Sequence, residues 1–207
     1  MNKLTNAPRV GIIVPTLNRP DFVIRQLKYY ARLDSPYTIY YADSSTPENA
    51  KKVTDEIAKL NNKLSIVYQP SPVGDSIQSI IQLLSSVQEK YVAFLGDDDY
   101  WVPDALNQCV EFLEKNPDYE TAIGKSVTFK TKNNAVFGKI KEIHDYPRHS
   151  IEDNTASERL FNYLGPNLSA VTATVVKTSH LLKYYQDSLE IKDANIRGEI
   201  LVSCLML

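Results

Sequence analysis

Three consecutive aspartates are the part of this sequence best suited to chemistry. Asp97, Asp98 and Asp99 follow Gly96 directly after the apolar run 91–95, which is typical of a buried strand. Adjacent carboxylates repel one another unless a cation neutralises them, and Mg²⁺ and Mn²⁺ prefer oxygen ligands. In parallel α/β sheets, ligands bind beyond the carboxyl ends of the strands. The segment therefore predicts a cation site, with a solvated acidic turn as the alternative.

Polar residues follow the first predicted strand, 10–14, in the order Pro15, Thr16, Leu17, Asn18 and Arg19. Backbone amides there, together with the start of the next helix, are expected to hold an anion or a nucleotide base. The segment contains neither the glycine-rich dinucleotide fingerprint nor a P-loop, so those two phosphate-binding motifs are excluded.

Asp43 follows the second predicted strand, 37–41, and is placed for a ribose hydroxyl or a base. Taken alone it would be a neighbour of a helix cap. Because a strand-end carboxylate contributes little to a core, replacing Asp43 is expected to leave folding almost untouched.

The elements that must position these residues alternate along the first half of the chain. Apolar runs predict strands at 10–14, 37–41, 64–68 and 91–95. Helical periods follow each run, with Asn18 expected to cap the first helix and Ser45 with Glu48 to form a capping box on the second. Four strand–helix units in about 115 residues predict a mainly parallel sheet covered by helices on both faces.

The second half has a different pattern. Segments 121–131 and 135–140 flank Lys132-Asn133-Asn134 and predict a hairpin. Residues 144–157 are polar and irregular, which predicts a long loop, whereas 168–176 is strand-like and 179–185 favours a short helix. The apolar segment 196–207 either docks into the core or marks a cut in a longer protein.

Composition excludes several classes of protein. The chain has 207 residues, 43% of them hydrophobic, and a net charge of -2, which fits one globular domain and not a nucleic-acid-binding protein. No apolar run approaches the ~20 residues of a membrane span, and the N-terminus lacks the apolar centre of a signal peptide. Cys109 and Cys204 match no metal or disulfide spacing, which favours a reducing, cytoplasmic setting.

Three segments together resemble a known family. Val-Pro-Thr-Leu-Asn-Arg at 14–19, Tyr-Ala-Asp-Ser-Ser at 41–45 and Phe-Leu-Gly-Asp-Asp-Asp-Tyr-Trp-Val-Pro at 94–103 are similar to the inverting, family 2 type of GT-A glycosyltransferases. The resemblance covers residues 8–125. It implies one α/β/α sandwich over 1–207, with a mainly parallel sheet and a small antiparallel addition in the second half. Residues 1–125 would then bind the nucleotide, and 126–207 would form the acceptor side.

The resemblance also implies roles for single residues. Those expected to contact the nucleotide are Pro15, Thr16, Asn18, Arg19, Asp43, Asp75, Asp97 and Asp98. Asp97 and Asp99 are expected to hold Mn²⁺ or Mg²⁺ bridging the diphosphate.

A late carboxylate is expected to act as the general base. Glu199, in Arg197-Gly198-Glu199, could deprotonate an acceptor hydroxyl, with Asp193 as the second candidate. The alternative for Glu199 is a first-turn acid favoured by the helix dipole.

The resulting prediction is transfer of a sugar from a nucleotide donor, a UDP-sugar, to a hydroxyl of a glycan or lipid-linked acceptor. The protein would work in the cytoplasm or peripherally at the inner face of the membrane. Two alternatives stay open. A nucleotidyltransferase would need a glycine-rich, Lys- or Arg-bearing loop after the first strand, and 15–20 has neither glycine nor lysine. A non-catalytic domain would keep the donor pocket without the reaction.

Overall fold

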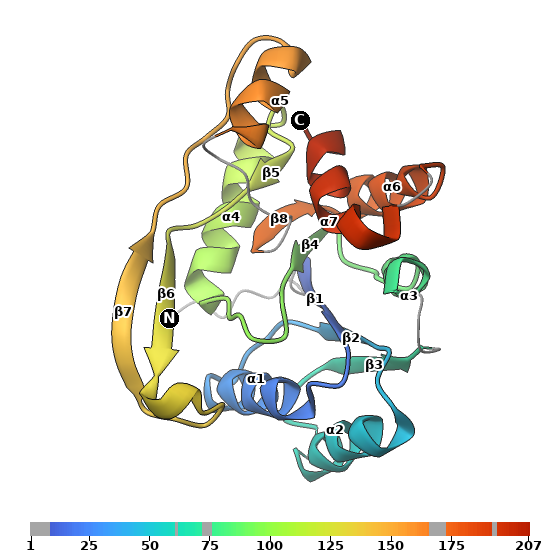
Figure 1. The fold of residues 1–207 in the computed structure, drawn as a ribbon, viewed down its shortest axis with the longest axis vertical. Helices are drawn as coiled ribbons and strands as arrows, with labels where there is room; N and C mark the ends of the chain where they lie inside the picture. Colours follow the sequence, from blue (N-terminus) through green and yellow to red (C-terminus); the bar gives the residue numbers. More distant parts are fainter. Residues whose placement is uncertain (1–8, 61, 72–75, 166–172, 192–193) are drawn as a thin grey trace.

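A six-stranded sheet with helices on both faces forms the body of the molecule (Figure 1). The computed structural model describes residues 9–60, 62–71, 76–165, 173–191 and 194–207, with only the backbone described for 76 and 194–199. The strands, in the order β3-β2-β1-β4-β8-β5, are β3 Ile66–Pro70, β2 Ile39–Asp43, β1 Val10–Thr16, β4 Tyr91–Phe94, β8 Thr174–Lys177 and β5 Thr121–Ala122. The first four are parallel, and β8 runs antiparallel to both of its neighbours. The predicted α/β/α sandwich with a mainly parallel sheet is confirmed.

Strand pairing moves two strands relative to the sequence prediction. β2 and β3 each begin and end two residues later than 37–41 and 64–68. The reason is the register, because β1 pairs with β2 as far as Thr16 opposite Asp43. Asp43 is therefore the last residue of its strand, at the same sheet edge as Thr16.

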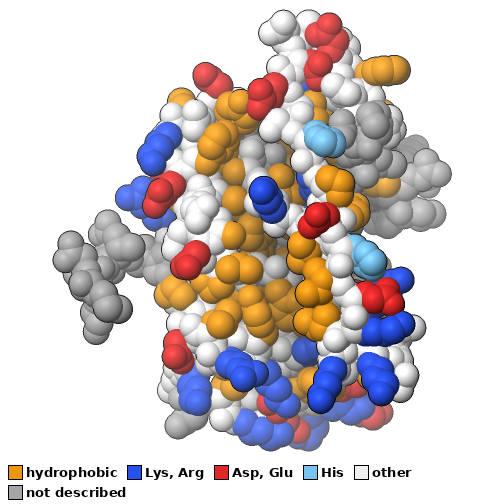
Figure 2. Space-filling model, turned by 90° about the vertical axis from the view of Figure 1, so that its left-hand side faces the viewer, with side chains coloured by type: hydrophobic (Ala, Val, Ile, Leu, Met, Phe, Trp, Pro, Cys, Tyr) orange, Lys and Arg blue, Asp and Glu red, His pale blue; other side chains and the backbone are white. Residues whose placement is uncertain are grey.

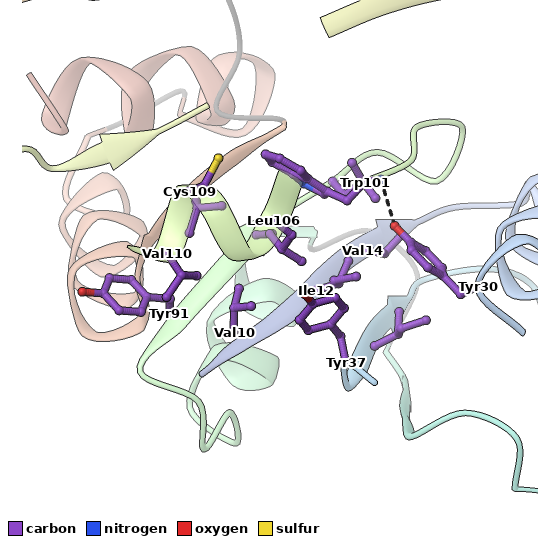
Figure 3. Packing of buried hydrophobic residues seen from close by; sticks show 14 of the residues in the cluster. Val10, Ile12, Val14, Tyr30, Tyr37, Tyr91, Trp101, Leu106, Cys109 and Val110 are labelled. Carbon is purple, nitrogen blue, oxygen red and sulfur yellow. Dashed lines mark hydrogen bonds between the residues drawn. The ribbon is translucent and has the colours of Figure 1, made fainter. Parts of the chain in front are cut away.

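The helices divide between the two faces of the sheet. They are α1 Pro20–Arg32, α2 Pro47–Lys59, α3 Ser76–Leu84, α4 Pro103–Lys115, α5 Ala156–Leu164, α6 Thr178–Ser188 and α7 Ala194–Leu205. Side chains of α1, α2 and α4 pack on one face with Ile12 and Val14 of β1, as Figure 3 shows in part. Side chains of α3, α6 and α7 pack on the other with Ile13. Successive side chains of β1 therefore point into the two cores in turn, as expected for a strand in a sheet that is covered on both faces.

The C-terminal apolar segment docks into the second core, as one of its two interpretations predicted. α7 packs against α6 and α3, and Val202 is fully buried there. The helix begins at Ala194, so Glu199 lies in its second turn and not in its first. The predicted helix 179–185 is α6, whereas the predicted strand 168–176 overlaps the described residues only as β8.

Both predicted helix caps are wrong. Arg19, not Asn18, is the N-cap of α1, and Thr46, not Ser45, is the N-cap of α2. Asn18 adopts a positive φ of 55° and turns its side chain to the start of α2, where its Oδ1 accepts a hydrogen bond from the backbone N of Thr46 at 2.9 Å. Proline in the first turn fixes the start of both helices instead.

A separate hairpin runs along one side of the molecule, at the left of Figure 1. It consists of β6 Ser126–Thr131 and β7 Ile140–Tyr146, joined through the 3-10 turn Lys132–Asn134. The hairpin prediction is confirmed in part. Of the first predicted arm, 121–131, only Ser126–Thr131 belongs to the hairpin, because Thr121–Ala122 form β5 of the large sheet. The second strand lies later than the predicted arm 135–140. That segment is used to reverse the chain, with the N of Lys132 donating to the O of Lys139 at 2.9 Å.

The loop predicted for 144–157 is wrong at both ends. Its start belongs to β7, and its end belongs to α5. A capping box at Thr155 begins α5, because Thr155 Oγ1 accepts from the N of Glu158 at 3.3 Å while Thr155 N donates to Glu158 Oε2 at 3.1 Å. The Thr-x-x-Glu spacing was a usable signal for this helix.

Candidate functional site

The candidate site lies where the strand order changes direction. β2 and β3 continue to one side of β1, whereas β4 lies on its other side. Open α/β sheets form a crevice for ligands at such a point, beyond the carboxyl ends of the two strands. Thr16 ends β1 and Asp97 follows β4, and Thr16 Oγ1 donates a hydrogen bond to Asp97 Oδ2 at 2.7 Å. Both side chains are buried, so this bond closes the base of the crevice.

Arg19 brings a positive charge to the aspartates. Its guanidinium pairs with Asp97 Oδ1 at 2.7 Å and with Asp98 Oδ2 at 2.8 Å, and lies 4.0 Å from the ring centroid of Phe22. Arg19 is half-exposed, whereas Asp97 is buried. Because both oxygens of Asp97 have partners, its carboxylate is held in one orientation.

Asp98 and Asp99 bend back over Gly96. A methyl group on Gly96 would lie 3.1 Å from Asp99 Oδ2 and 3.2 Å from Asp98 Oδ1. Two carboxylate oxygens from neighbouring residues therefore lie close to the one place that a side chain at residue 96 would occupy. The structure thus brings Asp99 together with Asp98. Asp97 instead accepts a hydrogen bond from Thr16 and pairs with Arg19.

Two carboxyl groups of this segment, those of Asp97 and Asp99, have a pKa above that of an ordinary aspartate. Burial raises the pKa of Asp97, against the opposing effects of the Thr16 hydrogen bond and the Arg19 charge. Burial raises the pKa of Asp99 as well, and the neighbouring Asp98 carboxylate adds to the shift. A cation at this place would relieve both effects.

Gln26 of α1 fixes the backbone of the aspartate segment and was not predicted. It is fully buried, and its Nε2 donates to the O of Gly96 at 3.1 Å and to the O of Asp99 at 2.9 Å. Tyr41 in turn donates to Gln26 Oε1 at 2.8 Å. A glutamine beside Leu27 on the apolar stripe of α1 was the available sequence signal, since buried polar groups need partners.

Tyrosines hold the residues that follow the aspartates. The N of Trp101 donates to the hydroxyl of Tyr30 at 3.0 Å, the dashed contact in Figure 3. Tyr29 donates to the O of Trp101 at 3.2 Å, and Tyr37 donates to the O of Pro103 at 2.9 Å. Three of the 13 tyrosines of the chain are therefore used to hold this segment in place.

Asp43 is buried at the end of β2, and both of its oxygens have donors. Oδ1 accepts from the N of Ser45 at 2.8 Å, and Oδ2 accepts from the hydroxyl of Tyr68 at 2.5 Å. Burial, with the Asp43 carboxylate next, raises the pKa of Tyr68, so that hydroxyl stays a donor. The expectation that replacing Asp43 leaves folding untouched is therefore wrong, because Asp43→Ala would leave the Tyr68 hydroxyl unpaired.

Asn18 and Pro15 complete the rim of the crevice. Asn18 is exposed and links β1 to α2, with its N donating to Ser45 Oγ at 2.6 Å. Pro15 is half-buried within β1, opposite Ala42. Asp75 and Asp193 lie outside the described residues, and so does the side chain of Glu199.

A groove of about 330 Å³ opens beside the aspartates. Phe22 and Arg25 of α1 line one side, and β6 lines the other, with Asp98 and Asp99 at one end. Arg25 spans it, because its Nη1 donates to the O of Val136 at 2.8 Å and its Nε donates to the hydroxyl of Tyr100. The hairpin is thereby tied to α1 next to the site.

The residues at the site fit a divalent cation held partly by a ligand. In the described part of the chain, no group of three or more His, Cys, Asp or Glu side chains is arranged to hold a metal by itself. Mg²⁺ is commonly bound by one or two carboxylates together with substrate phosphates, and the convergent oxygens of Asp98 and Asp99 supply such a pair.

Comparison with known proteins agrees with this arrangement. The family model described as Glycosyl transferase family 2 matches residues 11–171, which contain β1, β4 and the aspartates. The chain belongs to glycosyl transferase family 2. It is thus a member of a family of glycosyltransferases, as the three resembling segments indicated.

Relatives of this family 2 chain include TuaG of Bacillus subtilis (strain 168), a glycosyltransferase named for teichuronic acid biosynthesis. The two are 24% identical over 107 residues, which are 51% of this chain and 42% of TuaG. Among solved structures, S. aureus TarS 1-349 superimposes with a TM-score of 0.58 at 20% identity, covering 94% of this chain and 54% of TarS. The likeness shows the GT-A fold, and the chain spans about half the length of these relatives.

A second TarS 1-349 structure contains UDP-GlcNAc, and it matches with a TM-score of 0.53 at 19% identity over 84% of this chain and 46% of that one.

No helix in the described part of the family 2 chain is both long and apolar enough to cross a membrane.

Proposed function

We propose that this chain transfers a sugar from a nucleotide-sugar donor to a hydroxyl acceptor. The observation that carries the proposal is the joining of Thr16 to Asp97 across the strand-order reversal, with Asp98 and Asp99 converging beside it. Membership of family 2 and the fold shared with TarS support it. The donor is a UDP-sugar, by analogy with the TarS structure that contains UDP-GlcNAc.

The nucleotide lies along the carboxyl ends of β1, β2 and β4 in this proposal. Pro15, Thr16 and Asp43 face the base and ribose, with Asp75 as a further contact to the base. Asp97 accepts a hydrogen bond from a ribose hydroxyl. Thr16 and Arg19 hold its carboxylate in the orientation that this bond needs. Arg19 and Asn18 stand at the start of α1, where an anion is stabilised by the helix dipole.

Asp98 and Asp99 would hold Mn²⁺ or Mg²⁺ at the diphosphate, with Asp97 close behind. When bound, the cation offsets the charge that develops on the leaving nucleotide. The carboxylates contribute orientation, because Gln26 and Gly96 fix the backbone from which they project.

In this proposal the acceptor approaches through the groove between α1 and β6, and residues 126–207 form the acceptor side. Glu199 takes the proton of the acceptor hydroxyl, and Asp193 is the second candidate for this role. The hydroxyl oxygen then bonds to the anomeric carbon as the bond from that carbon to the diphosphate breaks. Attack from the opposite side inverts the configuration. The acceptor is a glycan or lipid-linked hydroxyl.

Titration of UDP into the protein with Mn²⁺, and with a chelator instead, tests the site. We expect tight binding only with the metal, and loss of that dependence in Asp99→Asn. The matched control is Asp118→Asn, an exposed aspartate after α4, which should keep it. UDP affinity that ignores the chelator would remove the metal from the proposal and leave the fold intact.

Product analysis with UDP-sugars separates the alternatives. A glycosyltransferase releases UDP from the donor, also slowly to water, whereas a nucleotidyltransferase releases pyrophosphate from UTP and a sugar phosphate. A binding domain retains the donor unchanged. Release of UDP that Glu199→Gln lowers about 10²–10⁴-fold, at unchanged donor affinity, supports Glu199 as the base.

A further inference from the structure

The tip of the β6–β7 hairpin concentrates positive charge in a molecule that is slightly acidic. The tip, residues 130–141, carries four lysines and no acidic residue, although the whole chain has a net charge of -2. Lys130 and Lys141 share Glu142, at 3.7 and 2.9 Å. Among the residues that the structure describes, Lys132 and Lys139 have no acidic partner. Figure 2, which looks at the hairpin side, shows Lys and Arg gathered along its lower edge.

Two large apolar side chains stand exposed among these lysines. Phe137 and Ile140 are each 58% exposed, and the ring of Phe137 lies 5.4 Å from Nζ of Lys28 on α1. Single exposed apolar residues are ordinary on protein surfaces. An exposed aromatic and an exposed aliphatic side chain on a hairpin tip that also carries Lys132 and Lys139 form a surface of a particular kind, both apolar and basic.

The tip is a preformed turn. The N of Gly138 donates to the O of Ala135 at 3.0 Å, and Thr131 Oγ1 donates to the same oxygen at 2.7 Å. A side chain at Gly138 would lie 3.0 Å from the O of Lys132, so the two arms of the turn are in close contact. Phe137 and the lysines are therefore presented together without a large ordering cost on binding.

We propose that this tip, residues 130–141, docks on a membrane surface rich in anionic lipids. Phosphate headgroups would face the lysines, and Phe137 with Ile140 would enter the boundary between headgroups and acyl chains. The groove beside Asp98 and Asp99 is lined by the same hairpin, so docking brings it to the membrane. That consequence suits a lipid-linked acceptor and rests on the proposed function, whereas the docking itself does not.

Sedimentation with vesicles tests the docking without donor, acceptor or metal. We expect binding to vesicles of phosphatidylglycerol and phosphatidylcholine, and little to phosphatidylcholine alone. Lys132→Ser with Lys139→Ser should lower the partition coefficient about 25-fold at low salt, since each lysine at an anionic surface is worth about a factor of five. Phe137→Ser with Ile140→Ser should lower it in high salt as well.

The matched control is Lys115→Ser with Lys183→Ser, the same change of charge on α4 and α6, which should bind like the parent. Circular dichroism checks that each variant is folded.

Absence of vesicle binding would overturn the proposal and leave the lysines as protection of an exposed hairpin against edge-to-edge pairing. An equal loss of vesicle binding in the control variant would overturn the proposal too. So would release from vesicles by soluble polyphosphate together with no effect of the Phe137 substitution on binding. A dimer of this chain that Phe137→Ser dissociates would also overturn it. UDP release by a protein that ignores vesicles would leave the proposed function standing.

Discussion

At the scale of single residues, Gly96 decides where two carboxylates can go. Carboxylate oxygens of Asp98 and Asp99 lie beside it, 3.2 and 3.1 Å from the place that a Cβ at residue 96 would take. Asp97 is set by different contacts, to Thr16 and Arg19. Three identical neighbours in sequence therefore have distinct surroundings, and only two of them converge.

Gly96→Ala should weaken metal-dependent UDP binding with little change in stability. The added methyl group meets only the far ends of two flexible side chains, so folding should change by less than about 1 kcal/mol. Displaced carboxylates should lower affinity about tenfold to a hundredfold. Titration calorimetry and urea unfolding measure the two effects. Gly124→Ala is the control, because its methyl group would meet ordinary contacts at 3.9 and 4.0 Å.

Asp97 should make the folded state less stable as pH rises. Burial raises its pKa above the unfolded value of about 3.9, so the folded protein binds this proton more tightly. Its contribution to stability is present below the unfolded pKa and is lost as pH rises through the folded pKa. The stability of Asp97→Asn relative to the parent should therefore increase over that window and then level off.

Urea unfolding from acidic to neutral pH measures this difference. Thr16→Val removes the hydrogen bond that lowers the pKa of Asp97, so in that background the window should move to higher pH. A relative stability of Asp97→Asn that falls with pH would contradict the assignment of burial as the dominant cause.

At the scale of elements, α1 connects the parts of the site. Gln26 holds the aspartate segment from below, and Arg25 spans the groove to the hairpin. Arg19, its N-cap, pairs with two of the aspartates. One helix thus fixes the orientation of a β4 extension and of β6, although neither is near it in the sequence.

Gln26→Leu should lower both the stability of the protein and metal-dependent binding at the proposed site. The change removes both donors to the segment and leaves the hydroxyl of Tyr41 without its acceptor, which should cost at least about 1–3 kcal/mol. Metal-dependent UDP affinity should fall as well. Gln26→Glu keeps an acceptor for Tyr41 but places a buried carboxyl group against the carbonyl oxygens of Gly96 and Asp99, so it should also lower stability and affinity. Gln108→Leu, on the exposed face of α4, is the control for the substitution itself.

At the scale of the whole molecule, two cores hold the sheet between them. The core with α1 and α4 lies behind the aspartate segment, and the core with α3, α6 and α7 lies on the opposite face. The second core joins residues from both halves of the chain. The sheet that carries the crevice is therefore covered on one face by helices from both halves of the chain, although the described side chains of the crevice come from the first half.

Val202→Ala should destabilise the protein by about 1–3 kcal/mol, because Val202 is fully buried in the second core. Chemical denaturation measures the loss, and Val127→Ala, at a 58% exposed position of the hairpin, should cost far less. Equal effects of the two substitutions would mean that α7 does not dock on α3 and α6 in solution.

The sequence by itself determined the sheet and the edge on which the site lies. Continuous apolar runs predict buried parallel strands, and the carboxyl ends of such strands must meet at one edge, so Thr16, Asp43 and Asp97 could be placed near one another. These inferences hold because they depend on local periodicity and on a rule of connection. The cap predicted at Asn18 is wrong because its side chain bonds to the backbone N of Thr46 at the start of α2 and not to the start of α1.

Tertiary structure alone decided which residues touch. Gln26 reads as one more position on a helix stripe until the fold brings Gly96 and Asp99 against it. Asp97 is paired with Arg19, which lies 78 positions away in the sequence and pairs with Asp98 as well. Only the turn of the hairpin shows that Phe137 is exposed on the same tip as the lysines. Such contacts follow from packing between distant segments, which no local pattern encodes.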